Sequence, residues 1–116
     1  MPAKSVFDMS FASVYAALIN KAERKNRTRS EVDEVTAWLT GYTQEQIAAF
    51  MTSDLSYGDF FRQAPAYNPL SERITGKICG IQVEMIEDPL MKKVRQMDKL
   101  VDELAKGRPM QKVLRR

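Results

Sequence analysis

The sequence predicts an all-α fold: a compact bundle of five to six short helices closed by a long C-terminal helix, with at most one short extended segment. Two observations predict it. Apolar residues recur at intervals of three and four along most of the chain, which is the spacing of one helix face. Residues that start and stop helices separate these segments almost from end to end. The length of 116 residues fits a single domain, residues 1–116, with residues 1–9 and 108–116 as flexible ends.

The first predicted helix runs from Ser10 to about Arg24. Ser10 is a typical N-cap residue, because its side chain can accept a hydrogen bond from a free backbone amide of the first turn. The residues after it keep one apolar face, which consists of Phe11, Val14, Tyr15, Leu18, Ile19 and Ala22. The basic residues that follow suit a helix C-terminus, since cations interact favourably with the helix dipole.

Two capping boxes predict the next two helices. Thr28 pairs with Glu31, and Thr43 pairs with Gln46, each at the spacing that satisfies two backbone amides reciprocally. Gly41 lies between them and can end the earlier helix in a left-handed conformation. The apolar faces of these helices are Val32, Val35, Trp38 and Leu39, then Ile47, Phe50 and Met51.

Two further helices are predicted before residue 80. Ser56 and Asp59 can start a short helix that Pro65 ends, because the residue before a proline is disfavoured in the helical region. Asn68–Pro69 combines an N-cap residue with proline at the first helical position. The next apolar residues step by four, which predicts a helix over 69–79 that Gly80 closes; they are Leu70, Ile74 and Ile78.

Residues 81–86 form the only strand-like segment of the sequence. Apolar and polar residues alternate from Ile81 to Met85, and this period of two is typical of extended backbone. No other strand is predicted for it to pair with. The segment is therefore either a packed connector or a strand that pairs with a second copy of the chain.

The longest predicted helix covers residues 89–106. Asp88–Pro89 repeats the cap-plus-proline start, and Gly107 is placed to end the helix. Its apolar residues step by four and three, which favours helix-on-helix packing within the domain over a dimer stripe; they are Leu90, Val94, Met97, Val101 and Leu104. Pro109 can then begin one last turn.

Several stretches of the chain have a characteristic sequence. They are the run Ala37–Thr43, the pair Ala64–Pro65, the stretch Ile78–Met91 and the stretch Asp98–Gly107. With them, nearly the whole chain resembles a bacterial family known as domain of unknown function 2200 (DUF2200). The resemblance implies a small, stand-alone cytosolic protein, and it implies no activity and no site residues.

The composition argues against an enzyme. The chain has no histidine and one cysteine, which excludes zinc sites built on His or on several Cys, and excludes an internal disulfide. Cys79 lies near a predicted helix C-terminus and is expected to be buried and structural. Glu84, Glu87 and Asp88 could do acid–base chemistry or hold Mg²⁺, but capping of the following helix is the favoured role. We therefore predict no catalytic residues, no metal and no cofactor.

The sequence also predicts the location of the protein. No apolar run approaches the roughly 20 residues that span a bilayer. Residues 1–10 lack the apolar stretch of a signal peptide. We therefore expect a cytoplasmic protein without membrane contact.

The charges are segregated along the chain. Residues 30–61 contain six carboxylates and no Lys or Arg, whereas residues 21–29 and 106–116 are basic clusters. Such clusters indicate contact with an anionic partner. The candidate contact residues are Lys21, Arg24, Lys25, Arg27, Arg29, Arg108, Lys112, Arg115 and Arg116.

A helix-turn-helix pattern over residues 33–52 suggests that the anionic partner is nucleic acid. Ala37, Gly41 and Ile47 have the spacing of the small residue, the turn glycine and the buried branched residue of that motif. The head of its second helix carries polar side chains that can contact base edges: Thr43, Gln44 and Gln46. The absence of nearby cations argues against DNA binding, since contacts to phosphates supply much of the affinity. The favoured hypothesis is thus a binding or regulatory module whose partner is a protein or a second copy, and the alternative is a nucleic-acid-binding protein.

Overall fold

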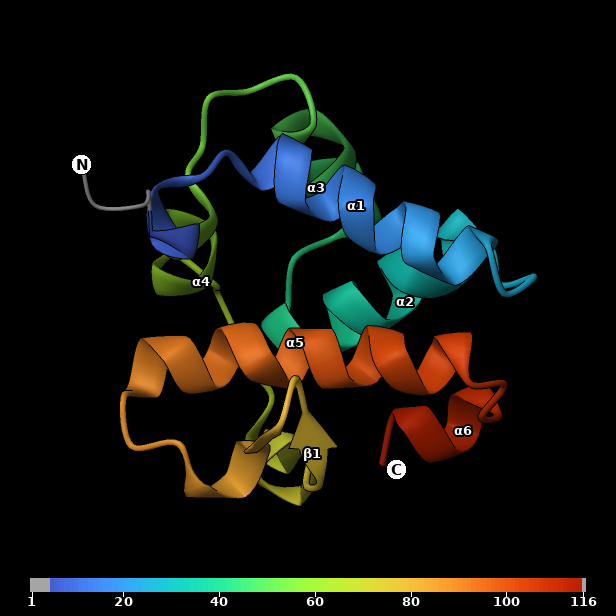
Figure 1. Ribbon diagram of the computed structural model, residues 1–116. Helices are drawn as coiled ribbons and strands as arrows, with labels where there is room; N and C mark the ends of the chain where they lie inside the picture. The colour runs from blue at the N-terminus through green and yellow to red at the C-terminus, as the bar shows by residue number, and fades with distance from the viewer. Residues whose placement is uncertain (1–4, 116) are drawn as a thin grey trace.

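The fold of this computed structural model, which describes residues 5–115, is organised around one long helix, α5. Figure 1 shows α5 crossing the molecule, with α1 and α2 on one side and the β-hairpin on the other. The short helix α6 folds back beside the C-terminal end of α5. In chain order the elements are η1 (Val6–Asp8), α1 (Phe11–Glu23), α2 (Arg29–Thr40), α3 (Gln44–Phe50), α4 (Tyr57–Arg62), η2 (Pro69–Arg73), β1 (Lys77–Ile78), β2 (Ile81–Gln82), η3 (Val83–Met85), α5 (Pro89–Ala105) and α6 (Met110–Val113).

The predicted all-α fold class is confirmed. Within residues 5–115 the structure has six α-helices and one sheet of two very short strands. The predicted caps are made: the Ser10 side chain accepts from the Ser13 amide, and both capping boxes, at Thr28 and Thr43, are complete. Gly41 ends α2 with a φ of 83°, in the left-handed region that favours glycine. These local signals set the helix boundaries to within one or two residues of the prediction.

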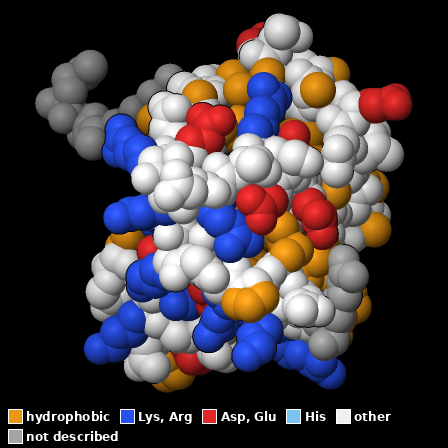
Figure 2. Space-filling view, turned by 90° about the vertical axis from the view of Figure 1, so that its right-hand side faces the viewer, with side chains coloured by type: hydrophobic (Ala, Val, Ile, Leu, Met, Phe, Trp, Pro, Cys, Tyr) orange, Lys and Arg blue, Asp and Glu red, His pale blue; other side chains and the backbone are white. Residues whose placement is uncertain are grey.

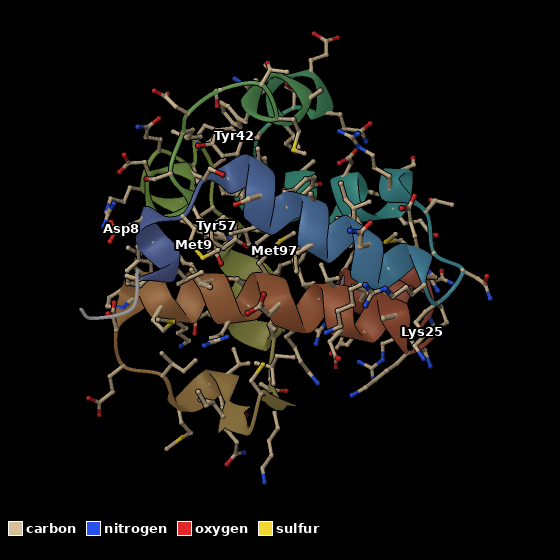
Figure 3. The ribbon with its side chains drawn as sticks, turned by 45° about the horizontal axis from the view of Figure 1, so that its top comes forward. Asp8, Met9, Lys25, Tyr42, Tyr57 and Met97 are labelled. Carbon is tan, nitrogen blue, oxygen red and sulfur yellow. The ribbon has the colours of Figure 1, made fainter. Side chains whose placement is uncertain are left out.

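The buried face of α5 forms the centre of the core. The helix packs against α1 and α2. The Thr36 hydroxyl of α2 lies 3.8 Å from the Met97 sulfur, and Figure 3 shows Met97 beneath α1. The residues of the predicted seam from Val94 onward are at most 1% exposed within the single chain. This seam therefore packs inside the domain, as expected.

Aromatic rings fill the other part of the core. The ring of Phe60 stacks on the rings of Phe11 and Tyr42, with distances between ring centroids of 4.4 Å and 4.9 Å. The Tyr42 hydroxyl donates to the Phe60 carbonyl at 2.7 Å, which fixes the turn after α2 against α4. Phe50 of α3 lies edge-on to Phe60 at 6.0 Å, so the cluster joins α1, α3 and α4.

The predicted helix over 69–79 is wrong. The structure has only the 3₁₀ turn η2, and Ile74 is already extended, with a φ of −80° and a ψ of 107°. Gly76 then takes a φ of 106°, and its amide hydrogen bonds to the Glu84 carboxylate instead of an earlier carbonyl. Ile74 and Ile78 are nevertheless 1% and 6% exposed. The spacing of four between them therefore reflects two buried side chains on an irregular, extended backbone and not one face of a helix.

The segment 81–86 finds its strand partner within the chain, so neither predicted alternative is needed. β1 and β2 pair antiparallel, with Lys77 opposite Gln82, and Val83–Met85 continues as η3. The loop consists of Cys79 and Gly80, both with positive φ, the backbone of a tight two-residue hairpin. The expectation of a buried Cys79 is therefore wrong: its thiol is free and exposed at the tip of the hairpin.

The two ends of the described chain carry secondary structure. Residues 5–9 include η1, and residues 108–115 include α6, where Val113 and Leu114 are buried. Residues 1–4 and 116 lie outside the described residues. One domain with flexible ends stays a prediction.

Burial of the four tyrosines gives a testable alkaline transition. Desolvation raises the pKa of the hydroxyls of Tyr15, Tyr42, Tyr57 and Tyr67 above the ordinary value of about 10. A folded-state pKa above the unfolded one contributes stability that is present below about pH 10 and is lost as the pH rises further. We expect no phenolate absorbance near pH 10 in the folded protein. Phenolate absorbance should instead appear together with loss of the helical circular dichroism signal.

The control for this titration is the protein in concentrated guanidinium chloride, where the four tyrosines should ionise near pH 10. A tyrosine that ionises normally while the helical signal is unchanged would contradict the burial described here.

Candidate functional site

The two basic clusters predicted from the sequence meet at one end of the molecule. Arg27 Nη1 donates to the Arg108 carbonyl at 3.1 Å, across 81 residues of sequence. Lys21 Nζ lies 3.3 Å from the Asp102 carboxylate, which also binds Lys106 at 2.9 Å. We call the last turn of α1, the α1–α2 loop, the start of α2 and the segment from Lys99 to Arg115 the basic end. Its cations are Lys21, Arg24, Lys25, Arg27, Arg29, Lys99, Lys106, Arg108, Lys112 and Arg115.

The figures show the same convergence. Figure 3 places Lys25 on the α1–α2 loop, beside the C-terminal end of α5. Figure 2 looks at this end and shows Lys and Arg side chains gathered across its lower half, with Asp and Glu side chains above them. The predicted contact residue Arg116 lies outside the described residues. The others listed from the sequence all lie at or beside this end.

Most cations of the basic end are paired with carboxylates of the same chain. Arg27 binds Glu31 at 2.7 Å, and Arg29 approaches Asp33 at 3.7 Å. These two pairs neutralise part of the first cluster. The cations of the basic end that form no ion pair among residues 5–115 are Arg24, Lys25 and Lys112.

Two carboxylates on α5 organise the second cluster. Burial alone would raise the pKa of Asp102, but hydrogen bonds from Lys106 and Lys21 hold that pKa below its usual range. Glu103 is only 5% exposed, and Arg115 binds it with two parallel contacts of 2.6 and 2.8 Å. This bidentate pair ties α6 to α5.

A pocket of about 400 Å³ opens between the end of α5 and α6. Its cations come from three places: Lys99 and Lys106 on α5, Arg108 in the turn, and Lys112 on α6. Glu103 is the one carboxylate of the described lining. Sequence reasoning missed Lys99 and Glu103. Their spacing of four on one helix was visible, but their role depends on α6 folding back over them.

The helix pair over residues 33–52 exists, and Gly41 makes its turn as predicted. Thr43 and Gln46, which the helix-turn-helix alternative would place against bases, hydrogen bond to each other's backbone amides in the predicted capping box. Figure 1 shows α3 at the far side of α1 and α2 from α6. The predicted recognition helix and the pocket cations are thus on different faces.

Two of the three candidate catalytic carboxylates, Glu84 and Asp88, have structural roles. Glu84 accepts from the Gly76 amide at 3.2 Å, and Asp88 accepts from the Leu90 amide at 3.0 Å at the start of α5. Cys79 stands apart at the hairpin tip. Across residues 5–115, no three His, Cys, Asp or Glu side chains are grouped in a way that could hold a metal ion.

Comparison with known proteins gives the family. A family model described as uncharacterized protein conserved in bacteria, DUF2200, matches residues 5–115, and the chain belongs to this family. The chain is also similar to a crystal structure of uncharacterized protein SP1917, with 53% sequence identity and a TM-score of 0.91. That match covers 97% of this chain and 94% of the other. No curated protein sequence matches the chain. Within the described residues, no helix has the length and apolar character needed to span a membrane.

Proposed function

We propose that the protein is a small, non-catalytic cytoplasmic binding module, and that its basic end contacts an acidic segment of a partner protein. One observation carries the proposal: two cation clusters far apart in the sequence converge on one end, where Arg24, Lys25 and Lys112 have no ion pair among residues 5–115. Complementary charge of this kind guides association and selects partners.

The arrangement favours a protein partner over nucleic acid. The basic end contains its own carboxylates, Glu31, Asp33, Asp102 and Glu103, so positive and negative groups alternate across it. A nucleic-acid backbone presents an unbroken row of negative charges, so along such a surface it would meet these carboxylates as well as the cations. An acidic protein segment with its own basic residues fits such an alternating surface.

A second copy of the chain is less suited than another protein. In the acidic stretch of residues 30–61, Glu31 and Asp33 already bind Arg27 and Arg29, and Asp59 binds Arg62 at 2.9 Å. At least half of its six carboxylates are therefore engaged within the chain. Self-association through this stretch would break existing pairs.

Charge reversal at the basic end tests the proposal. The test variant carries Arg24→Glu, Lys25→Glu and Lys112→Glu, which removes the cations without an ion pair and leaves the buried pairs intact. The control carries Arg62→Glu, Lys92→Glu and Lys93→Glu, which changes the net charge equally on α4 and at the other end of α5. It also removes the exposed pairs of Arg62 with Asp59 and of Lys92 with Glu72, so circular dichroism checks that the control is folded. Binding of a labelled peptide that mixes Glu with occasional Lys is followed by fluorescence anisotropy, at low and moderate salt.

The test variant is expected to bind the peptide about tenfold more weakly, since three surface charges each contribute a few tenths of a kcal/mol. The control should bind within twofold of the natural chain, on the order of 0.4 kcal/mol. Tighter, steeply salt-dependent binding of duplex DNA in the same assay would overturn the proposal in favour of nucleic acid. Light scattering that shows a dimer broken by the test variant would overturn it in favour of self-association.

A further inference from the structure

The pocket between the end of α5 and α6 has the size and charge of a binding site for a small anion. From its geometry we propose that it binds a phosphoryl group, either as a free phosphate ion or as the phosphate of a small phosphate ester. This small-molecule site is separate from the protein partner proposed above. The proposal does not depend on whether a protein binds the surrounding surface.

The pocket is large enough for such a ligand. Its volume of about 400 Å³ falls within the range of small-molecule sites, roughly 300–1,000 Å³. Four cationic side chains line it from three directions, because Lys106 and Lys99 project from α5, Arg108 from the turn and Lys112 from α6. A phosphoryl group has three acceptor oxygens, so it can be approached from several sides, whereas a carboxylate has only two.

The charges around the pocket do not balance. Its lining cations and Arg115 amount to five positive charges, whereas the adjoining carboxylates Asp102 and Glu103 amount to two negative ones, which leaves a surplus of three. Arg115 binds both oxygens of the Glu103 carboxylate. Arg108 and Lys99 lie farther from these oxygens, at 3.4 Å and 4.0 Å, so Glu103 neutralises their charges only in part. Mutual repulsion of these cations is relieved by a bound dianion.

One cation of the pocket is held in place by the fold. The side chain of Lys99 is only 14% exposed, and its Nζ donates to the Lys77 carbonyl at 3.3 Å. The hairpin therefore fixes this ammonium group at the edge of the pocket. The ammonium group of this mostly buried lysine lies 4.0 Å from its nearest carboxylate, so an anionic ligand can still pair with its charge.

The lining also restricts the class of ligand. Its apolar part consists of Gly107 and Pro109, and no aromatic ring lines it among the described residues. A nucleotide base would find nothing to stack on. The pocket thus fits inorganic phosphate or a phosphorylated sugar, in which hydroxyl groups surround the phosphate.

The experiment titrates the full chain with inorganic phosphate and, separately, with glucose 6-phosphate at constant ionic strength. Backbone amide chemical shifts of Gly107 and Arg108 are followed by NMR. The test variant carries Arg108→Gln and Lys112→Gln, both exposed positions of the lining. The control carries Arg24→Gln and Lys25→Gln, which removes the same charge from the basic end outside the pocket.

We expect saturable shifts that the test variant weakens at least about tenfold, with less than about a twofold change in the control. Tighter binding of the ester would identify a phosphorylated small molecule as the ligand, and equal binding would identify the phosphate ion itself. Absence of saturation with both probes, up to about 20 mM, overturns the proposal. So does an equal loss in test and control variants, because that pattern indicates general screening of the basic end.

Discussion

The variant Phe60→Ala is expected to lose about 4 kcal/mol of unfolding free energy. Phe60 is fully buried, and its ring contacts the rings of Phe11, Tyr42, Phe61 and Tyr57 with centroid distances of 4.4 to 6.2 Å. Truncation removes those contacts and leaves a cavity at the point where α1, α3 and α4 meet. Such a loss is a large part of the total stability of a domain, roughly 5–15 kcal/mol.

Urea denaturation followed by circular dichroism measures this loss. Phe60→Leu retains most of the volume and should cost less than about 1.5 kcal/mol. Met85→Ala serves as the surface control, because Met85 is 71% exposed and its truncation should change stability by less than about 0.5 kcal/mol. Equal effects of Phe60→Ala and Met85→Ala would show that the aromatic cluster is not packed as described.

The variant Gly41→Ala is expected to lose about 3 kcal/mol. A left-handed φ of 83° costs about 1–2 kcal/mol for an alanine. In addition, the new Cβ would lie 2.7 Å from the Cβ of Ala66 and 2.9 Å from its backbone nitrogen. Ala66 cannot simply move away, since its amide donates to the Thr40 carbonyl at 3.1 Å, and Asn68 makes a similar bond to Leu39 at 2.8 Å. Overpacking of this kind adds about 1–3 kcal/mol.

Gly107→Ala separates the two contributions. Gly107 has a similar φ of 88°, but a Cβ there would meet nothing within 4 Å. Its replacement should cost only the conformational strain, about 1 kcal/mol. The difference between the two variants, about 2 kcal/mol, measures the contact with Ala66. If both variants lose the same stability, the close approach of residues 65–68 to the end of α2 is wrong.

Local signals made most helices predictable. Ser10, Thr28 and Thr43 act within their own first turns, and Gly41 acts at the end of its own helix. Their effects do not depend on the rest of the fold. The prediction failed at residues 74–80, where the spacing of Ile74 and Ile78 matched a helix and an extended backbone buried both side chains.

The hairpin was hidden for a related reason. Positive φ is uncommon for a residue other than glycine, and Cys79 is not a residue type that predicts a two-residue hairpin turn. Its alternating neighbours were visible as an extended stretch, but each strand has only two residues. So short a strand pair depends on packing against α5, which no pattern along the chain specifies.

The candidate site was predictable in part. The two clusters of cations could be found from residue types alone, because surface charge needs no tertiary context. Their meeting could not, since the contact between Arg27 and Arg108 spans 81 residues and requires α1 to pack on α5. Nor could the pocket, because Lys99 and Glu103 line a hollow only when α6 lies over them.

The central position of α5 affects how the chain folds during synthesis. Helices α1 and α2 bury their apolar faces mainly against each other and α5, yet α5 begins only at Pro89. At about 5–20 residues per second, the 65 residues from the end of α2 at Thr40 to the end of α5 at Ala105 take roughly 3–13 s to be added. Throughout that interval the emerging helices lack the surface that covers them. We therefore expect the apolar faces of α1 and α2 to stay uncovered until the last quarter of the sequence has left the ribosome.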